Sequence, residues 1–164
     1  MNKLFIGREK EQRQLKEYLS SDQSEFIAVY GRRRVGKTFL IQQVIGNNYA
    51  FYVAGMNNVS MRIQLKNFMQ GMRKNGEDIH TADTWLDAFI ALEDYLDSLP
   101  EGNKIVFIDE MPWMDTPRSN FISGLEHFWN SWASWRDDIK LIVCGSATSW
   151  ILNNLIKNRG GLNN

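Results

Sequence analysis

Residues Glu25–Thr38, EFIAVYGRRRVGKT, contain the strongest indication of the fold. Its first part, Glu25–Tyr30, is a short apolar and β-branched run, which is typical of a buried strand. Its second part, Gly31–Thr38, fits the pattern G-x-x-x-x-G-K-[ST], and Lys37–Ile45 then has the apolar spacing of a helix that stops at Gly46. A strand that leads through such a loop into a helix is the context in which this pattern holds phosphate. The stretch therefore predicts a phosphate-binding loop rather than a glycine-containing turn of no consequence.

The fixed positions of this loop each have a chemical reason. Gly31 and Gly36 permit backbone conformations that a Cβ would penalise, so backbone N–H groups can turn toward phosphate oxygens. Lys37 is expected to reach the β- and γ-phosphates, and the Thr38 hydroxyl is expected to ligate Mg²⁺. The predicted nucleotide-binding residues of this segment are Gly31, Arg32, Arg33, Arg34, Val35, Gly36, Lys37, Thr38 and Phe39.

Arg32, Arg33 and Arg34 within the loop leave two interpretations open. Their positive charges can add to the potential over the phosphates or contact a partner, nucleic acid included. The more ordinary alternative is that they point outward from an exposed loop, and we favour it. Nucleic-acid binding is therefore an unproven possibility at this point.

An acidic pair follows the third predicted strand, in Lys104–Glu110, KIVFIDE. Apolar residues fill the strand up to Ile108, so Asp109 would emerge at its carboxyl end, near the ion that Thr38 is expected to bind. Glu110 could polarise a water for in-line attack on the γ-phosphorus. An adjacent Asp-Glu pair can also be a plain polar turn, but the loop pattern earlier in the chain favours the metal and catalytic roles.

Strand and helix patterns alternate along the whole chain. Four strands are predicted, over Glu25–Tyr30, Tyr49–Ala54, Lys104–Ile108 and Lys140–Cys144. Helices are predicted around them, over Glu9–Leu19, Lys37–Ile45, from Ser60 to near Asn75, from Thr84 to Leu99, over Ser119–Trp135 and over Thr148–Lys157. Such alternation predicts an α/β fold, a three-layer sandwich in which helices cover both faces of a mainly parallel sheet.

Two groups of aromatic residues have different expected roles. Trp129, Trp132 and Trp135 recur every three residues in one predicted helix. An aromatic stripe at this spacing is more often core than a partner-binding ridge. Trp113 and Met114 follow the acidic pair instead, and we expect them to form a hydrophobic lip beside the nucleotide or a partner.

Composition places the chain among globular domains. Its 164 residues are 43% hydrophobic and 23% charged, which excludes a disordered chain and suits about one domain. The single cysteine, Cys144, excludes an internal disulfide, and no apolar run approaches the ~20 residues of a membrane span. A cytoplasmic protein with no membrane partner is therefore expected. The 19 basic and 19 acidic residues balance, so net charge does not indicate a partner.

The phosphate loop and the acidic strand together resemble one family. GRRRVGKT with IVFIDE looks like the P-loop ATPases of the additional-strand, catalytic-glutamate division, and more closely like the archaeal-type ATPase family of the AAA-like and STAND-related group. The opening Phe5–Glu9, with Glu11 and Leu15, is similar to that family's start, F-x-G-R-E-x-E-x-x-x-L. Ile142–Trp150 is similar to its fourth strand and sensor region. The resemblance covers nearly the whole chain.

This resemblance implies further site residues and a missing strand. Phe5, Ile6 and Gly7 would line the adenine, and Ser146 would be a polar sensor near the γ-phosphate or the attacking water, with a helix N-cap as its equally weighted alternative. Family members order their strands 5-1-4-3-2 and continue past the region that resembles Asn158–Leu162. Because only four strands are predicted, we expect a sheet without its fifth strand. Residues 1–164 would then be the amino-terminal portion of a longer ATPase, with a missing carboxyl-terminal domain or a partner protein and with self-association through an unpaired strand edge.

The activity that these expectations describe is Mg²⁺-dependent ATP binding with slow hydrolysis, driving a switch in a larger protein. ATP and ADP are the expected ligands, because no N-K-x-D sequence follows the acidic strand as in guanine-binding GTPases. Glu110, Lys37 and Ser146 are the predicted catalytic residues, and Thr38 and Asp109 the predicted metal ligands. Hydrolysis is expected to be slow because no arginine finger can be assigned. A P-loop phosphotransferase and a non-enzymatic, nucleotide-gated DNA- or protein-binding module are the alternatives.

Overall fold

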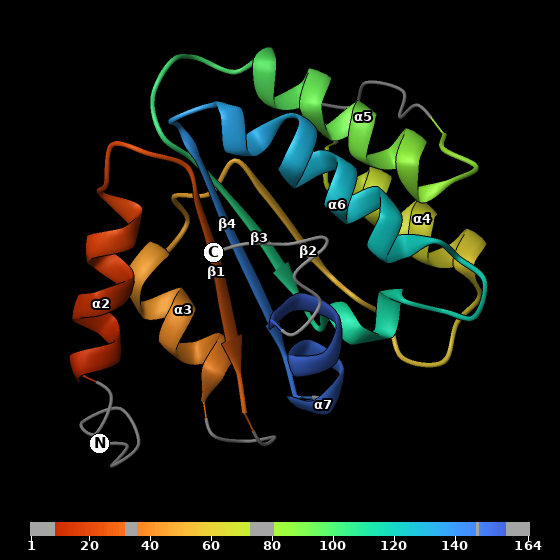
Figure 1. Ribbon diagram of the computed structural model, residues 1–164, viewed down its shortest axis with the longest axis horizontal. Coiled ribbons are helices and arrows are strands. Elements are labelled where there is room, and N and C mark those ends of the chain that lie inside the picture. Colours follow the sequence, from red (N-terminus) through yellow and green to blue (C-terminus); the bar gives the residue numbers. More distant parts are fainter. Residues whose placement is uncertain (1–8, 32–35, 73–80, 147, 157–164) are drawn as a thin grey trace.

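A parallel sheet of four strands forms the centre of the molecule (Figure 1). The computed structural model describes residues 9–31, 36–72, 81–146 and 148–156. The strands are β1 (Glu25–Tyr30), β2 (Phe51–Ala54), β3 (Lys104–Asp109) and β4 (Ile139–Gly145). Their order is β1-β4-β3-β2, and every neighbouring pair is parallel. The predicted α/β fold with a parallel sheet is confirmed.

Helices cover both faces of this sheet. One face carries α2 (Glu9–Leu19) and α3 (Lys37–Ile45). The other carries α4 (Met61–Gln70), α5 (Trp85–Asp97), α6 (Phe121–Ser131) and α7 (Thr148–Ile151), which continues as a π-helix over Leu152–Ile156. Two short 3₁₀ helices, Met111–Met114 and Ala133–Trp135, follow β3 and α6. The result is a three-layer sandwich in which each connection between parallel strands crosses a helical layer.

The two faces are packed with different side chains. The α4–α6 face is aromatic, with Phe68 at its centre in ring contact with Phe51, Trp85 and Phe89. The α2–α3 face is smaller and mostly aliphatic, with Ile41 and other apolar side chains in contact with the sheet. Four-residue β2 therefore receives most of its packing from the aromatic side, where each buried ring removes a large apolar area from water.

Two helices begin at the caps that the sequence predicts. The Ser60 side chain accepts a hydrogen bond from the backbone N–H of Ile63, and the Thr84 side chain accepts one from Asp87. Each bond satisfies a donor that has no partner within the helix, which stabilises a helix start by about 1 kcal/mol.

The aromatic stripe in the predicted helix 119–135 is only partly core. Trp129 is buried and packs edge-to-face on Phe26, at 5.2 Å between ring centroids. Trp135 is 84% exposed, because α6 ends at Ser131 and the helical spacing no longer places this residue over the sheet. The expected helix was therefore too long at both ends. Met114 also departs from expectation, since it is fully buried and forms no lip.

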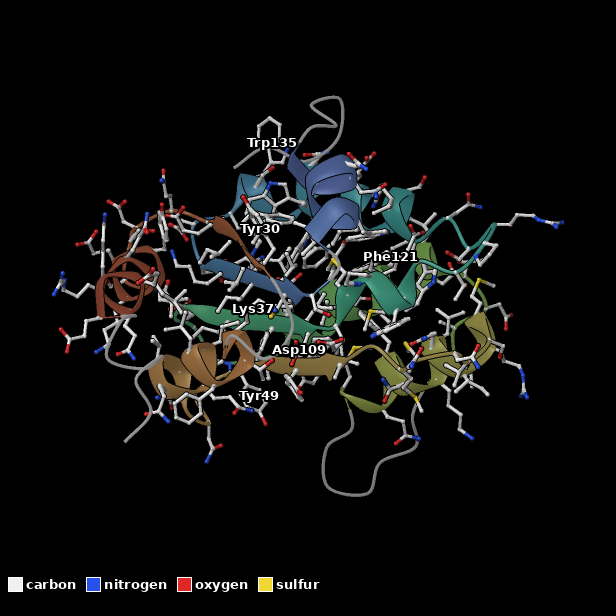
Figure 2. All side chains as sticks on the ribbon, turned by 90° about the horizontal axis from the view of Figure 1, so that it is seen from below. Tyr30, Lys37, Tyr49, Asp109, Phe121 and Trp135 are labelled. Carbon is white, nitrogen blue, oxygen red and sulfur yellow. The ribbon has the colours of Figure 1, made fainter. Side chains whose placement is uncertain are left out.

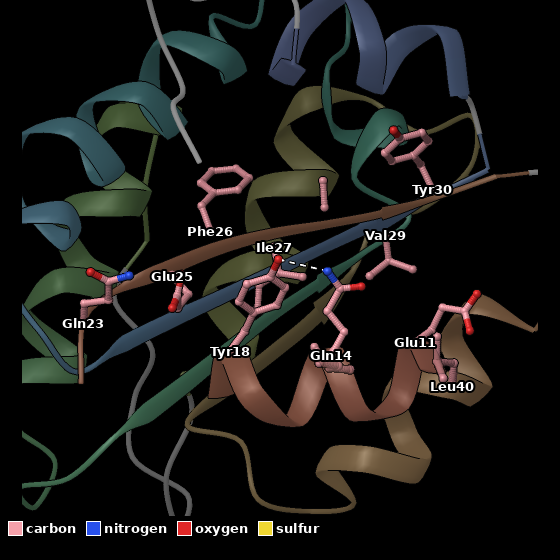
Figure 3. A pocket seen from close by; sticks show the side chains of 12 residues that line it. Glu11, Gln14, Tyr18, Gln23, Glu25, Phe26, Ile27, Val29, Tyr30 and Leu40 are labelled. Atoms are coloured by element: carbon pink, nitrogen blue, oxygen red, sulfur yellow. Dashed lines mark hydrogen bonds between the residues drawn. The ribbon is translucent and has the colours of Figure 1, made fainter. Parts of the chain in front are cut away.

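The outer edge of β1 is unpaired within the described residues, and a groove of about 610 Å³ runs along it (Figure 3). All six β1 residues line this groove, together with side chains of α2 such as Gln14 and Tyr18, which are hydrogen-bonded at 3.1 Å. The sheet thus has four strands in the described part of the chain, as expected. Within the same residues, no helix combines the length and apolar character that crossing a bilayer would need.

Candidate functional site

Polar side chains from two distant parts of the sequence meet at the carboxyl ends of the strands. Lys37 opens α3 and Asp109 closes β3, and Figure 2 shows both in the middle of the molecule. In open parallel sheets this edge is where ligands collect, because helix N-termini and strand ends converge there. The structure therefore brings the two sequence patterns into one place.

The glycines of the loop have the backbone conformation that explains their presence. Gly36, directly before α3, has φ +80° and ψ +27°, in the left-handed region. A Cβ at Gly36 would meet nothing within 4 Å, so the conformation and not the space requires glycine. Gly31, at φ +149°, begins the loop. Arg32, Arg33, Arg34 and Val35 lie outside the described residues.

Lys37 folds back over the loop that precedes it. Its side chain is 6% exposed, and Nζ donates a hydrogen bond to the Gly31 carbonyl oxygen at 3.0 Å. A lysine so buried needs hydrogen-bond acceptors or negative charge around it. The ammonium group consequently lies over the beginning of the loop, where the pattern predicts the phosphates.

Thr38 and Asp109 are in direct contact although 71 positions separate them. Thr38 Oγ1 donates to Asp109 Oδ2 at 3.0 Å, and Asp109 is only 5% exposed. The other oxygen, Oδ1, accepts from the backbone N–H of Glu110 at 2.8 Å. Hydroxyl and carboxylate oxygens are ligands of the kind that Mg²⁺ takes, alongside phosphate and water oxygens.

Glu110 occupies a sharp turn immediately after β3. Its backbone is left-handed, at φ +49° and ψ +39°, which is uncommon for a non-glycine residue. Its Oε2 accepts a hydrogen bond from the indole N–H of Trp113 at 2.9 Å. Gly55 fits against this turn so closely that a Cβ there would overlap the Glu110 carbonyl oxygen. The turn holds the carboxylate at the same edge as Lys37.

The strands on either side of β3, β4 and β2, each carry a group whose pKa is raised by burial and by the charge of this cluster. Burial, and next the carboxylate of Asp109, raise the pKa of the Cys144 thiol on β4. The same two causes raise the pKa of Tyr52 on β2. Cys144 is therefore a buried, protonated thiol, in agreement with the structural role that its place in a predicted strand indicates.

The other predicted site residues are Ser146, Phe39 and the three residues Phe5, Ile6 and Gly7. Ser146 follows β4 at the same edge and is half-buried, directly after Gly145, which packs against Pro112. Phe39, in the first turn of α3, is 45% exposed. Phe5, Ile6 and Gly7 lie outside the described residues.

Sequence reasoning missed Gln64 and Gly55 and gave Trp113 a different role. Gln64 is fully buried, and its amide bonds to backbone groups of Met56 and Trp113. The only available signal was the nearness of Trp113 to the acidic pair, because hydrogen-bond partners on separate elements cannot be read from periodicity.

The cluster fits a nucleotide-bound magnesium ion better than a metal held by protein alone. In the described residues, no three His, Cys, Asp or Glu side chains gather in a metal-binding arrangement. Mg²⁺ typically keeps several waters and takes one or two protein ligands beside substrate phosphates. The Thr38–Asp109 pair beside Lys37 satisfies that requirement.

Comparisons with known proteins find similarity in fold and in sequence. A Walker-type ATPase of Pyrococcus abyssi has a similar fold, with a TM-score of 0.63 at 18% sequence identity, over 94% of this chain and 49% of the solved chain. An uncharacterized protein of Methanocaldococcus jannaschii is 32% identical over 152 residues, which are 89% of this chain and 30% of that protein. The chain thus spans less than half the length of either protein.

A family model also covers almost the whole sequence. It describes an ATPase domain found predominantly in archaea, and it matches residues 5–163. The match includes the loop pattern, the acidic strand and the segment after β4. The chain therefore belongs to this family of ATPase domains with a P-loop α/β fold.

Proposed function

We propose that this module binds ATP with Mg²⁺ and hydrolyses it slowly, as the nucleotide-driven switch of a larger protein. The observation that carries the proposal is the 3.0 Å hydrogen bond between Thr38 Oγ1 and Asp109 Oδ2, next to the buried Lys37. Two segments far apart in sequence would have no reason to place a hydroxyl, a carboxylate and an ammonium together in an ordinary turn. Family membership supports the same conclusion.

Each residue of the cluster has a distinct task in this proposal. Lys37 neutralises charge on the β- and γ-phosphates, and backbone N–H groups at the start of α3 bind phosphate oxygens. Thr38 and Asp109 would hold Mg²⁺, which supplies electrostatic stabilisation of the phosphates when bound. Glu110 accepts a proton from the attacking water, and Ser146 senses the nucleotide near the γ-phosphate. Phe5–Gly7 would line the adenine. The protein would act in the cytoplasm.

Calorimetric titration tests the binding part of the proposal. We expect Mg²⁺-ATP and Mg²⁺-ADP to bind the native chain and GTP to bind more weakly. Lys37→Ala should weaken ATP binding about 100-fold, because a charge-assisted contact to phosphate is lost. Lys66→Ala removes an exposed lysine of α4 and should bind ATP like the native chain. Equal ATP affinity in both variants would contradict the proposed site.

Phosphate release tests the hydrolytic part. We expect turnover below about 1 s⁻¹, under the usual range of enzymes, because no arginine finger completes the described site. Product analysis separates the alternatives. A phosphotransferase would consume ATP only with an acceptor present, and a nucleotide-gated binding module would bind ATP without consuming it.

The groove along β1 supports the proposal that the module works inside a larger assembly. Its backbone groups on the outer side have no strand partner in the described part of the chain. An exposed strand edge favours pairing with a further strand, from another part of a larger protein, a partner protein or a second copy. Sedimentation over a range of concentrations tests self-association, and a monomer at every concentration would exclude the second copy.

A further inference from the structure

We infer that Trp113 is a positioning residue for Glu110, and that Gln64 fixes Trp113 in place. The indole N–H orients the carboxylate so that its second oxygen can accept the proton of the attacking water. This inference rests on the proposed function, in which Glu110 polarises that water. It adds the residues that hold the Glu110 carboxylate in one orientation.

The first step is the contact between the two side chains. Trp113 Nε1 donates to Glu110 Oε2 at 2.9 Å, a charge-assisted hydrogen bond of ordinary length. An ionised carboxylate has two acceptor oxygens, so this bond uses one and leaves the other to meet a water. A flexible glutamate would otherwise visit several rotamers, most of them turned away from the reacting atoms.

The backbone on both sides of this contact is also held. The N–H of Glu110 donates to Asp109 Oδ1 at 2.8 Å, and the N–H of Trp113 donates to the Glu110 carbonyl oxygen at 3.1 Å. Gly55 packs against the same carbonyl oxygen, where a Cβ would not fit. The backbones of Glu110 and Trp113, whose side chains form the carboxylate–indole hydrogen bond, are therefore both constrained.

Gln64 joins this turn to helix α4. Its Nε2 donates to the carbonyl oxygens of Trp113, at 3.0 Å, and Met56, at 2.5 Å, while its Oε1 accepts from the Met56 N–H at 3.1 Å. The side chain is fully buried, so each lost bond would leave a polar group without a partner. A buried amide with all these bonds fixes the turn more strongly than an exposed one.

Trp113→Phe tests the inference, because it removes the N–H and keeps an aromatic ring. We expect phosphate release at saturating Mg²⁺-ATP to fall about 10-fold, the effect of one charge-assisted hydrogen bond. Calorimetric ATP affinity should change by less than about 2-fold, since Trp113 acts on the rate and not on binding. The control is Trp135→Phe, which removes an exposed indole N–H bonded to the Asn130 carbonyl oxygen and should leave both quantities unchanged.

A double-variant cycle shows whether Trp113 acts through Glu110. Single-turnover hydrolysis by Glu110→Gln should be low, and adding Trp113→Phe should lower it no further, because the carboxylate that Trp113 orients is already absent. If Trp113→Phe lowered hydrolysis by the same factor in the Glu110→Gln chain as in the native chain, the effect would be a general structural defect. That result would overturn the inference. Gln64→Leu alone should reduce phosphate release. The chain with both Gln64→Leu and Trp113→Phe should release phosphate no more slowly than Trp113→Phe alone. Native phosphate release by Gln64→Leu would overturn the part of the inference that concerns Gln64.

A second replacement keeps the test decisive if Trp113→Phe does not fold. Benzothienylalanine at position 113 has the shape of tryptophan with sulfur in place of the N–H, and should show the same 10-fold fall. Native phosphate release with either replacement, or a rise above it, would overturn the inference while the ATPase assignment stands. Phosphate release that survives Lys37→Ala would instead overturn the ATPase assignment, and the inference with it.

Discussion

The two ends of the parallel sheet both bury lysines, but they use them differently. At the amino end, Lys140 is fully buried and its Nζ donates to backbone carbonyls of Ser21 and Gln23 and to the Ser21 hydroxyl. Lys104 there donates to Gly102 and pairs with Asp138 at 3.1 Å. These ammonium groups hold the α2–β1 loop and the start of β4, so they contribute to folding.

At the carboxyl end, polar groups come together around a loop that contains the phosphate pattern. Lys37 donates to the Gly31 carbonyl oxygen, Thr38 donates to Asp109, and Glu110 accepts from the indole of Trp113. A buried charge therefore does not by itself indicate a functional site. What distinguishes the carboxyl end is a left-handed glycine, a helix start and paired acids in one place.

Glu110→Gln should have the largest effect and should leave the amino end untouched. Phosphate release is expected to fall about 10²- to 10⁴-fold, because the base that accepts the proton of water is lost. ATP affinity and the midpoint of thermal unfolding should stay close to native, since the amide still accepts from Trp113. Stopped-flow phosphate detection and calorimetry measure the two quantities. Native turnover in this variant would show that the carboxyl end is not catalytic through Glu110.

Lys140→Ala, unlike Glu110→Gln, should lower the stability of the fold and leave the ATP site unchanged. We expect the free energy of unfolding to fall by about 2–3 kcal/mol, because carbonyls of the α2–β1 loop lose their donor and a cavity forms. Urea unfolding followed by circular dichroism measures this, with Lys16→Ala on the exposed side of α2 as control. ATP affinity of the folded variant should be native. A stability as high as that of Lys16→Ala would mean that the amino-end lysine is not a folding element.

Asp138→Asn should give a smaller loss of stability that depends on pH. The hydrogen bond from Arg136, and to a lesser extent Lys104, lower the pKa of Asp138 from 3.8 to about 2. A lowered pKa in the folded state means that the stabilisation is complete above about pH 5 and disappears as the pH falls through 3.8 to 2. At neutral pH the variant should lose about 1–2 kcal/mol.

Urea unfolding of the native chain and of Asp138→Asn at several pH values tests this expectation. Native chain and Asp138→Asn should converge in stability between about pH 5 and pH 2, while Asp137→Asn, at an exposed neighbouring position, should follow the native curve. A constant difference across this range would assign the effect to packing and not to the charged pair.

The reactivity of Cys144 tests the packing at the carboxyl end without any substitution. Because burial and Asp109 raise the pKa of its thiol, it should react with a disulfide reagent at pH 8 about 100 times more slowly in the folded chain than in urea. Absorbance of the released thiolate follows the reaction. Equal rates in both states would mean that the strand ends open readily and that the site is less rigid than the hydrogen bonds indicate.

Much of the fold was predictable because it depends on local patterns. Apolar β-branched runs located the four strands, and Ser60 and Thr84 located two helix starts. The length of α6 was not predictable, because the helix ends at Ser131 while the aromatic spacing continues to Trp135. Periodicity reports what a helix could bury, and only packing decides how far the helix extends.

At the site, the loop pattern, the acidic pair and the order of the strands and helices around them could be read from the sequence. Backbone preference and charge are properties of individual residues. The contact of Thr38 with Asp109 across 71 positions, and the bonds that join Trp113 and Gln64 to the Glu110 turn, become visible only in the folded chain. Hydrogen bonds between elements depend on how the strands are ordered and how the helices pack on them. No spacing within one segment encodes that arrangement.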